Sequence, residues 1–174
     1  MRLRPTALAG AILVEPDRHI DERGYFARTF CGRTFAAAGL PTTFVQCSTS
    51  FNRQRGTLRG LHYQDGPHPE GKLVRCTRGV IHDVALDLRG ADAGAPRWIG
   101  VELSAANGKA LWIPPGFAHG FVTLVADTEV LYQMTEFFDP DLVRGLRWND
   151  PGLGIEWPVT SPILSTRDAT WPLL

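Results

Sequence analysis

Residues 80–88 read VIHDVALDL, and this stretch decides the fold class. Its side chains alternate with the two-residue period of a β-strand. Apart from His82, one face of the run is apolar, whereas the other face carries Asp83 and Asp87. Carboxylates on a strand otherwise so prone to β-structure indicate a barrel with an occupied interior.

Similar short runs recur along the chain, separated by glycine, proline, asparagine or aspartate. Turns are predicted at Arg78-Gly79 and Asn107-Gly108, and a hairpin tip at 54–56. Helical periodicity is scarce, with the best short helix at 34–39, and the tail from 148 to 174, rich in proline and tryptophan, is expected to be irregular. The alternating runs predict strands at 73–78, 80–88, 98–103, 110–113, 119–125 and 130–137.

So many short strands in a chain of 174 residues indicate an all-β sandwich or barrel with one or two short helices. The sequence shows no internal repeat, low-complexity tract or linker. We therefore expect one domain over residues 1–174, large enough to bury a core without disulfides.

The charge balance excludes some partners. Lysine plus arginine equals aspartate plus glutamate, 18 against 18, so no global basic field would attract nucleic acid. An anionic ligand would have to be held by local arginines.

The cysteines and apolar segments bear on the compartment. Cys31, Cys47 and Cys76 are an odd number without close pairs, which favours a reducing compartment. The apolar run at 7–14 is short and is broken by Glu15-Pro16, so we expect no secretion signal. No apolar stretch approaches membrane-spanning length. The expectation is a soluble, cytoplasmic protein without a membrane partner.

The most informative stretch for function is RGLHYQ at 59–64. It places His62 on a strand-like run interrupted by a glycine, and Lys72 and Tyr132 lie on other strand-like segments that can converge on it. A base, a cation and a phenol are what proton removal beside a ketone requires: the base takes the proton, the cation holds the enolate, and the phenol returns a proton. This combination indicates an epimerase or isomerase rather than a hydrolase.

Strand alternation raises a question about this stretch. It places Gly60 and Gln64 on the face of His62 and points Arg59 the opposite way. If Arg59 and His62 reach one ligand, either Gly60 marks a bulge or the arginine curls around the strand. The sequence leaves both possibilities open.

A collinear set of motifs resembles the deoxysugar epimerases typified by dTDP-4-dehydrorhamnose 3,5-epimerase. The resemblance covers almost the whole chain and implies an antiparallel jelly roll of cupin type, that is, a double-stranded β-helix. The motifs are DERGYF at 21–26, GTLRGLHYQ at 56–64, GKLVRC at 71–76, DVALDLR at 83–89, IPPGFAHGF at 113–121, WNDP at 148–151 and STRD at 165–168.

The resemblance also implies roles for single residues. His62 would be the base, Asp168 its orienting partner, Tyr132 the acid and Lys72 the group that stabilises the enolate. No cofactor is implied, because the substrate carries its own electron sink. The family is dimeric with an exchanged N-terminal strand, so Arg23 would serve the neighbouring subunit's site. The substrate contacts implied are Arg23, Phe26, Gln46, Arg59, His119, Phe138 and Arg167, with Phe138 stacking on the nucleotide base.

Three departures from the family pattern affect binding. Arg28 stands where the family usually has a glutamate, Cys47-Ser48 replaces an aspartate-asparagine pair, and Phe137-Phe138 replaces a tyrosine pair. We therefore add Arg28 and Ser48 to the predicted substrate contacts. Arg28 is hypothesised to contact the diphosphate or a ribose hydroxyl, since a guanidinium suits phosphate oxygens. The choice among dTDP, CDP and GDP sugars stays open.

The histidines also raise the possibility of a metal site. PPGFAH at 114–119 has the form of the second motif of metal-binding cupins, but position 64 is glutamine where the first motif would carry a histidine. His62 and His119, with Glu70 as a third candidate donor, make a poor site for zinc or iron. A metal-free pocket is therefore expected.

The sequence thus predicts a homodimeric, cofactor-independent epimerase of a nucleotide-diphosphate 4-keto-6-deoxysugar. Two alternatives remain: an enzyme that inverts only C3 or only C5 of another nucleotide sugar, and a metal-dependent cupin oxygenase or isomerase. A sugar-binding cupin without activity is disfavoured, because it has no reason to keep base, cation and phenol together.

Overall fold

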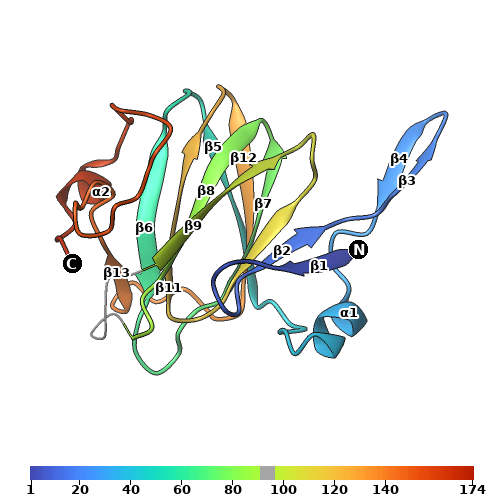
Figure 1. Cartoon of the computed structure of the whole chain (residues 1–174), viewed down its shortest axis with the longest axis horizontal. Coiled ribbons are helices and arrows are strands. Elements are labelled where there is room, and N and C mark those ends of the chain that lie inside the picture. Colours follow the sequence, from blue (N-terminus) through green and yellow to red (C-terminus); the bar gives the residue numbers. More distant parts are fainter. Residues whose placement is uncertain (91–96) are drawn as a thin grey trace.

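The computed structural model describes residues 1–90 and 97–174. Two large antiparallel sheets pack face to face, and a separate two-stranded sheet projects from them (Figure 1). This is the antiparallel jelly roll of cupin type that the sequence predicted. The six-stranded sheet contains, in order, β1 (Arg2–Pro5), β2 (Ile12–Glu15), β10 (Ala110–Ile113), β7 (Lys72–Arg78), β12 (Thr128–Met134) and β5 (Gln46–Asn52). The five-stranded sheet contains β13 (Val143–Gly145), β6 (Leu58–Gln64), β11 (Phe117–Thr123), β8 (Val80–Asp87) and β9 (Arg97–Ser104).

Strand β8, the one that decided the fold class, is buried on both faces. Its inner face contributes Ile81 and Ala85 to the core between the sheets. Its outer face packs Val84 and Leu86 against Leu153 of the C-terminal tail. The two aspartates lie on the inner face and each has a partner, His119 for Asp83 and Arg89 for Asp87. Paired carboxylates inside the barrel explain the charged face that the sequence showed.

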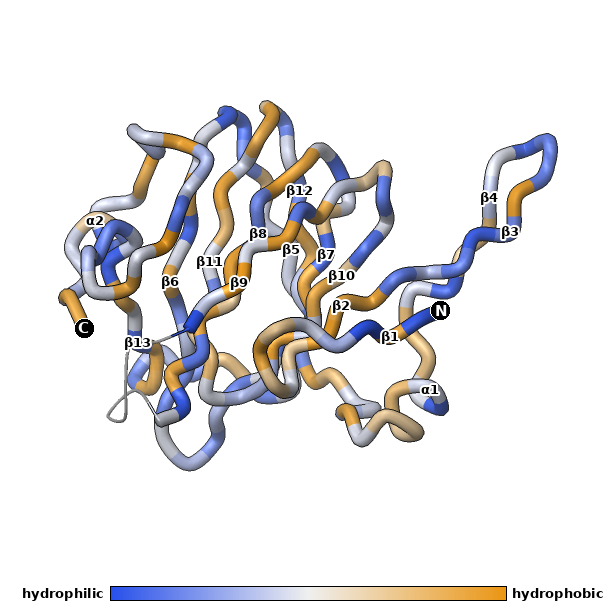
Figure 2. The backbone as a smooth tube through the Cα atoms, in the orientation of Figure 1, coloured by the Kyte–Doolittle hydropathy of each residue, from blue (hydrophilic) through white to orange (hydrophobic). Residues whose placement is uncertain are grey.

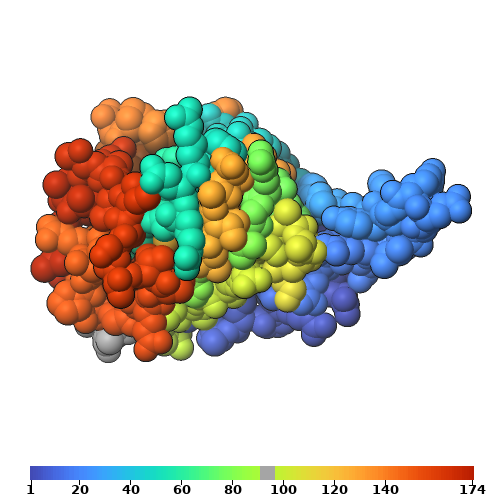
Figure 3. Space-filling view, turned by 90° about the horizontal axis from the view of Figure 1, so that it is seen from above, coloured from blue at the N-terminus to red at the C-terminus, as the bar shows by residue number. Residues whose placement is uncertain are grey.

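The hairpin of β3 (Arg18–Asp21) and β4 (Gly24–Ala27) extends away from the two sheets (Figures 1 and 3). Its tip is hydrophilic (Figure 2). Its strands nevertheless expose large apolar side chains, since Ile20 is 79%, Tyr25 55% and Phe26 70% exposed. A two-stranded hairpin is marginal by itself, so these apolar groups favour a covering partner.

The structure corrects several predicted boundaries. The predicted helix at 34–39 lies two residues earlier, as α1 (Gly32–Ala37). The predicted strand at 130–137 ends at Met134, so Phe137 and Phe138 lie in the following loop. The expected irregular tail contains a short helix, α2 (Thr166–Thr170), capped by the Ser165 hydroxyl. The strands β1 to β5 and β13 were not among those predicted.

In the part of the chain that the structure describes, no helix is long and apolar enough to cross a membrane.

Candidate active site

A cavity of about 330 Å³ opens between the two sheets at the ends of β6, β7 and β12. All four predicted catalytic residues line it. The cavity is lined by Arg59, His62, Tyr63, Gln64, Glu70, Lys72, Tyr132, Met134, Phe138, Val143, Ser165, Arg167 and Asp168.

A bulge in β6 brings Arg59 and His62 to the same cavity. His62 lies opposite His119 and Arg59 lies opposite Phe121, so four residues of β6 span the distance of three on β11. Gly60 occupies the extra position with φ of +138°, and a Cβ there would lie 2.5 Å from the Cα of Gly120. Only glycine fits this approach. The bulge at Gly60, and not an arginine that curls around the strand, therefore brings Arg59 and His62 to one cavity.

His62 is held by a carboxylate from the C-terminal helix. Its Nε2 lies 2.6 Å from Oδ1 of Asp168, which is only 5% exposed. Ser165 positions the carboxylate, because its hydroxyl accepts the backbone N–H of Asp168 and starts α2. Burial by itself would raise the pKa of Asp168. The hydrogen bond from His62 and the charge of the imidazole outweigh this effect, so the pKa of Asp168 lies below its usual value. Asp168 is thus an ionised partner for the imidazole.

Lys72 and Tyr132 lie on the opposite sheet from His62, on neighbouring strands. Burial lowers the pKa of the Lys72 ammonium to about 8. Burial also raises the pKa of the Tyr132 phenol well above its ordinary range, so the phenol keeps its proton. The Oη of Tyr132 lies 3.2 Å from the Oγ of Ser50 on β5. The cavity therefore has a base on one wall, and a cation and a proton donor on the other.

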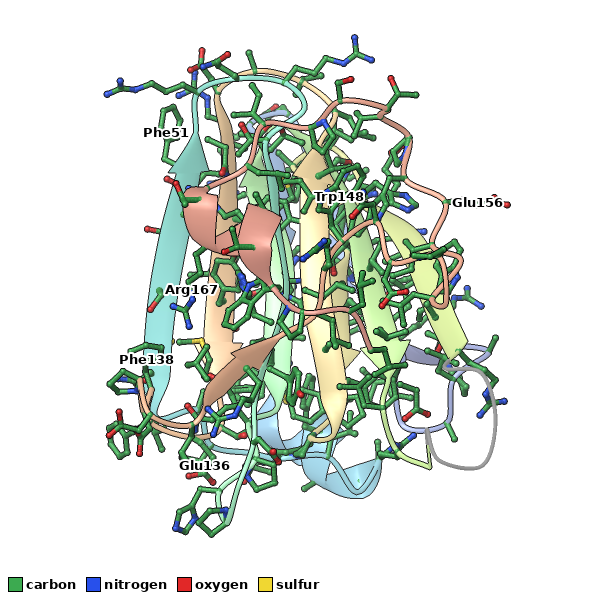
Figure 4. The ribbon with its side chains drawn as sticks, turned by 90° about the vertical axis from the view of Figure 1, so that its left-hand side faces the viewer. Phe51, Glu136, Phe138, Trp148, Glu156 and Arg167 are labelled. Carbon is green, nitrogen blue, oxygen red and sulfur yellow. The ribbon has the colours of Figure 1, made fainter. Side chains whose placement is uncertain are left out.

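The mouth of the cavity carries Phe138 and Arg167. Figure 4 places Phe138 at the lower end of β5, on the same side of the view as Arg167 of α2. The backbone N–H of Phe138 donates to Oε1 of Gln46 at 2.6 Å. Arg59, which also lines the cavity, donates through Nε to Oδ1 of Asn52 at 2.8 Å. An exposed aromatic ring near two guanidinium groups suits a nucleotide base and its diphosphate.

The remaining predicted contacts lie elsewhere in this chain. Arg23 is at the tip of the projecting hairpin, paired with Asp21, and Phe26 and Arg28 are exposed at its base. None of the three lines the cavity of the same chain. Ser48 pairs in register with Tyr132 on the exposed edge strand β5. Their roles in binding stay predictions.

His119 lies behind the cavity wall rather than on it. It is 5% exposed, its Nε2 lies 2.8 Å from Oδ1 of Asp83, and its ring packs edge-on against Tyr132 at 6.1 Å. His119 therefore packs against the ring of Tyr132. A direct contact between His119 and a substrate stays a prediction.

Position 64, where a metal-binding cupin would carry a histidine, has a different task here. The Gln64 amide donates to the carbonyls of His68 at 3.2 Å and Phe137 at 3.1 Å, and accepts the N–H of Asp139 at 3.0 Å. It thereby fastens the loop that presents Phe138. Within residues 1–90 and 97–174, no group of three or more histidine, cysteine, aspartate or glutamate side chains is arranged to hold a metal ion.

Sequence reasoning missed several residues of the site, among them Ser165, Ser50 and Glu70. Ser50 shares a face of β5 with positions 46 and 48, and this alternation could have revealed it. Glu70 was considered only as a metal donor, yet its carboxylate contacts the Lys72 ammonium. Its spacing of two residues from Lys72 in an extended segment was the available signal.

A cupin-type jelly roll whose cavity joins a carboxylate-bound histidine, a lysine and a protonated tyrosine defines a carbohydrate epimerase, an enzyme of the isomerase class. Comparisons with known proteins agree: the family model described as dTDP-4-dehydrorhamnose 3,5-epimerase matches residues 5–174. The chain belongs to this family.

Individual relatives show how close the match is. The dTDP-4-dehydrorhamnose 3,5-epimerase of Salmonella typhimurium is 45% identical over 97% of this chain and 93% of its own length. The crystal structure of the Bacillus anthracis enzyme with TDP and pyrophosphate bound superposes with a TM-score of 0.95 at 42% identity, covering 99% of each chain. A 3'-monoepimerase from Streptomyces bikiniensis in complex with dTDP-quinovose has a TM-score of 0.89 at 32% identity, covering 97% of this chain and 86% of that one.

Proposed function

We propose that the protein inverts both C3 and C5 of dTDP-4-dehydro-6-deoxyglucose. One observation carries the proposal: His62 and Tyr132 enter a single cavity from opposite sheets, beside the Lys72 ammonium. Two walls that carry a base and an acid match a reaction that removes a proton from one face of a carbon and returns it to the other.

The chemistry begins at the C4 ketone, which acidifies the hydrogens at C3 and C5. His62 takes one of these protons, the C–H electron pair forms the enolate, and negative charge gathers on O4. Lys72 donates a charge-assisted hydrogen bond to that oxygen. Tyr132 then protonates the opposite face of the carbon, and solvent resets both groups. Each positioned acid or base contributes ~10² to 10⁴-fold to the rate.

The contact with Asp168 decides which nitrogen of His62 acts. Because the carboxylate is ionised and lies 2.6 Å from Nε2, that nitrogen carries the N–H. Nδ1 is then the lone-pair nitrogen that accepts the proton from carbon. The positive charge that develops on the imidazole is stabilised by the same carboxylate.

Solvent-deuterium exchange tests the proposal. With dTDP-4-dehydro-6-deoxyglucose in D₂O, the protein should introduce deuterium at C3 and at C5, which NMR of the product resolves. His62→Asn should abolish exchange at both carbons and still bind dTDP. The matched control is His68→Asn, whose exposed side chain lies outside the cavity and should exchange at the wild-type rate. Deuterium at only one carbon would place the protein with the monoepimerases.

We further propose that the protein is a homodimer in which the β3–β4 hairpin reaches the partner's cavity. The exposed Ile20, Tyr25 and Phe26 of the projecting hairpin support this arrangement, as does the position of Arg23 far from its own cavity. Co-expressed Arg23→Ala and His62→Asn chains should form mixed dimers with one intact site. These mixtures should be more active than either variant alone, and no gain would contradict the exchange of hairpins.

Arg28 is proposed to contact the diphosphate or a ribose hydroxyl in the same partner site. Its position at the end of the hairpin and its exposed side chain support this role. Arg28→Glu should weaken binding and change the order of preference among dTDP, CDP and GDP sugars. Arg33→Glu, an exposed charge reversal on α1, is the control. Equal affinities in both variants and the wild type would make Arg28 a surface residue.

A further inference from the structure

Glu70 and Lys72 form an ion pair inside the cavity wall. The Glu70 carboxylate contacts the Lys72 ammonium, and their side chains are only 9% and 15% exposed. Both line the cavity together with His62 and Tyr132. The pair is therefore part of the site and not a surface salt bridge, so solvent screens it little.

The other charged groups of the cavity have partners of their own. On β6, Arg59 donates to Asn52, and His62 is bound to Asp168 of α2. The guanidinium of Arg167, also on α2, stacks over the ring of Trp171 at 4.8 Å.

The strands beside β7 bring no further charge to Lys72. Its register partners are Met134 on β12 and Ile113 on β10, and Tyr132 is held neutral by burial. Among the described residues that line the cavity, Glu70 is thus the carboxylate available to the ammonium.

We propose that Glu70 is a positioning residue that keeps Lys72 charged and directed into the cavity, and so sets the upper pH limit of the reaction. The proposal rests on the proposed function, in which Lys72 meets the enolate. A neutral amine would stabilise the charge on O4 less than an ammonium does, because its hydrogen bond is not charge-assisted. Lys72 has three N–H donors, so one can bind Glu70 while another reaches the substrate.

The energetic argument concerns the balance between burial and the carboxylate. Burial lowers the pKa of Lys72 to about 8 in the structure that has the Glu70 carboxylate in place. An opposite charge within about 4–6 Å favours the charged form of a buried group by roughly 1–3 pH units. Without Glu70, much of the lysine would therefore lose its proton near neutral pH.

The chain is well suited to a direct test, because Lys72 and Lys109 are its two lysines. Protein labelled with [¹³C]lysine gives two side-chain signals, and Lys109→Arg assigns them without touching the cavity. In Glu70→Gln the titration midpoint of Lys72 should fall by about 1–3 pH units while that of Lys109 stays constant. Unfolding would instead raise the Lys72 midpoint toward the ordinary lysine value of about 10.4, so a fall in the midpoint also shows that the variant is folded.

Two further variants sharpen the result. Glu156→Gln removes an exposed carboxylate at the opposite edge of the molecule (Figure 4) and should leave both midpoints unchanged. Glu70→Asp keeps the charge and should restore the midpoint at least partly. The same Lys72 midpoint in the wild type, Glu70→Gln and Glu156→Gln would overturn the proposal.

The pH profile of deuterium exchange links this coupling to the reaction. In Glu70→Gln the alkaline limb of kcat should move down by the same amount as the lysine midpoint, with KM nearly unchanged. If the midpoint moves and the alkaline limb does not, Glu70 is not a positioning residue for the reaction. If the wild type exchanges no deuterium, the proposed function fails, while the lysine titration still decides whether Glu70 keeps Lys72 charged.

Discussion

Gly60→Ala tests whether the bulge in β6 builds the active site. The new Cβ would lie 2.5 Å from the Cα of Gly120 and 3.0 Å from the carbonyl oxygen of His119, both of them backbone atoms that cannot rotate away. The positive φ of +138° adds about 1–3 kcal/mol of conformational strain. Overpacking adds about 1–3 kcal/mol. The expected loss is therefore about 2–6 kcal/mol, a large part of the ~5–15 kcal/mol that stabilises a domain.

Gly56→Ala is the matched control for this substitution. Gly56 also has a positive φ, +82°, but a Cβ there would meet nothing within 4 Å. It should cost only the strain of about 1–2 kcal/mol. Urea unfolding measures both losses of stability. Deuterium exchange into the substrate, without urea and at a temperature where each variant is folded, measures function.

The control should keep its exchange rate, whereas Gly60→Ala should lose it because Arg59 and His62 no longer face one cavity. Equal unfolding midpoints in the two variants, with exchange retained in Gly60→Ala, would refute the reasoning.

Other changes test the individual roles in the cavity. Tyr132→Phe should cost about 1 kcal/mol of stability, since only the hydrogen bond to Ser50 is lost. Net inversion, followed by NMR, should fall ~10² to 10⁴-fold while some proton removal survives, and unchanged inversion would make another group the acid. The pKa of Asp168 is lower in the folded protein than in the unfolded chain. The ionised carboxylate therefore stabilises the fold fully above about pH 4, and this stabilisation is lost as the pH falls through the pKa of the folded state. Urea unfolding should thus show the gap between wild type and Asp168→Asn narrowing on acidification; a constant gap would contradict the ionised pair. Phe138→Ala should raise KM for the dTDP sugar with kcat nearly unchanged, because a stacked base contributes about 1–3 kcal/mol, and a purely kcat effect would argue against stacking. Activity should persist in excess EDTA; loss that a transition metal restores would move the chain to the metal-dependent cupins.

Much of the architecture could be predicted from local pattern. The alternation at 80–88 and the glycine turns gave six strands, because side-chain period and turn chemistry are local properties. The predicted strand at 130–137 is too long, because the chain leaves the sheet after Met134 and the Gln64 amide binds the carbonyl of Phe137 in the loop that follows. β1 to β4 and β13 are only three or four residues long, too short for alternation to show, and the seven residues of β5 are mostly polar.

The catalytic set illustrates the same division. The residue types of His62, Lys72 and Tyr132 and the ordered motifs determined the reaction class and the family, because chemistry follows from functional groups and their order. Which wall each group occupies was decided by the tertiary structure, through the pairing of β6 with β11 and of β7 with β12.

Two features were decided only by the tertiary structure. Strand alternation would have separated Arg59 from His62, and only the close approach of Gly60 to Gly120 forces the bulge that unites them. Likewise, the sequence shows the spacing of Glu70 and Lys72, but only the folded structure buries their contact in the cavity wall. A sequence records which groups are present and how they alternate, whereas register, burial and the pairing of charges depend on segments that meet only when the chain has folded.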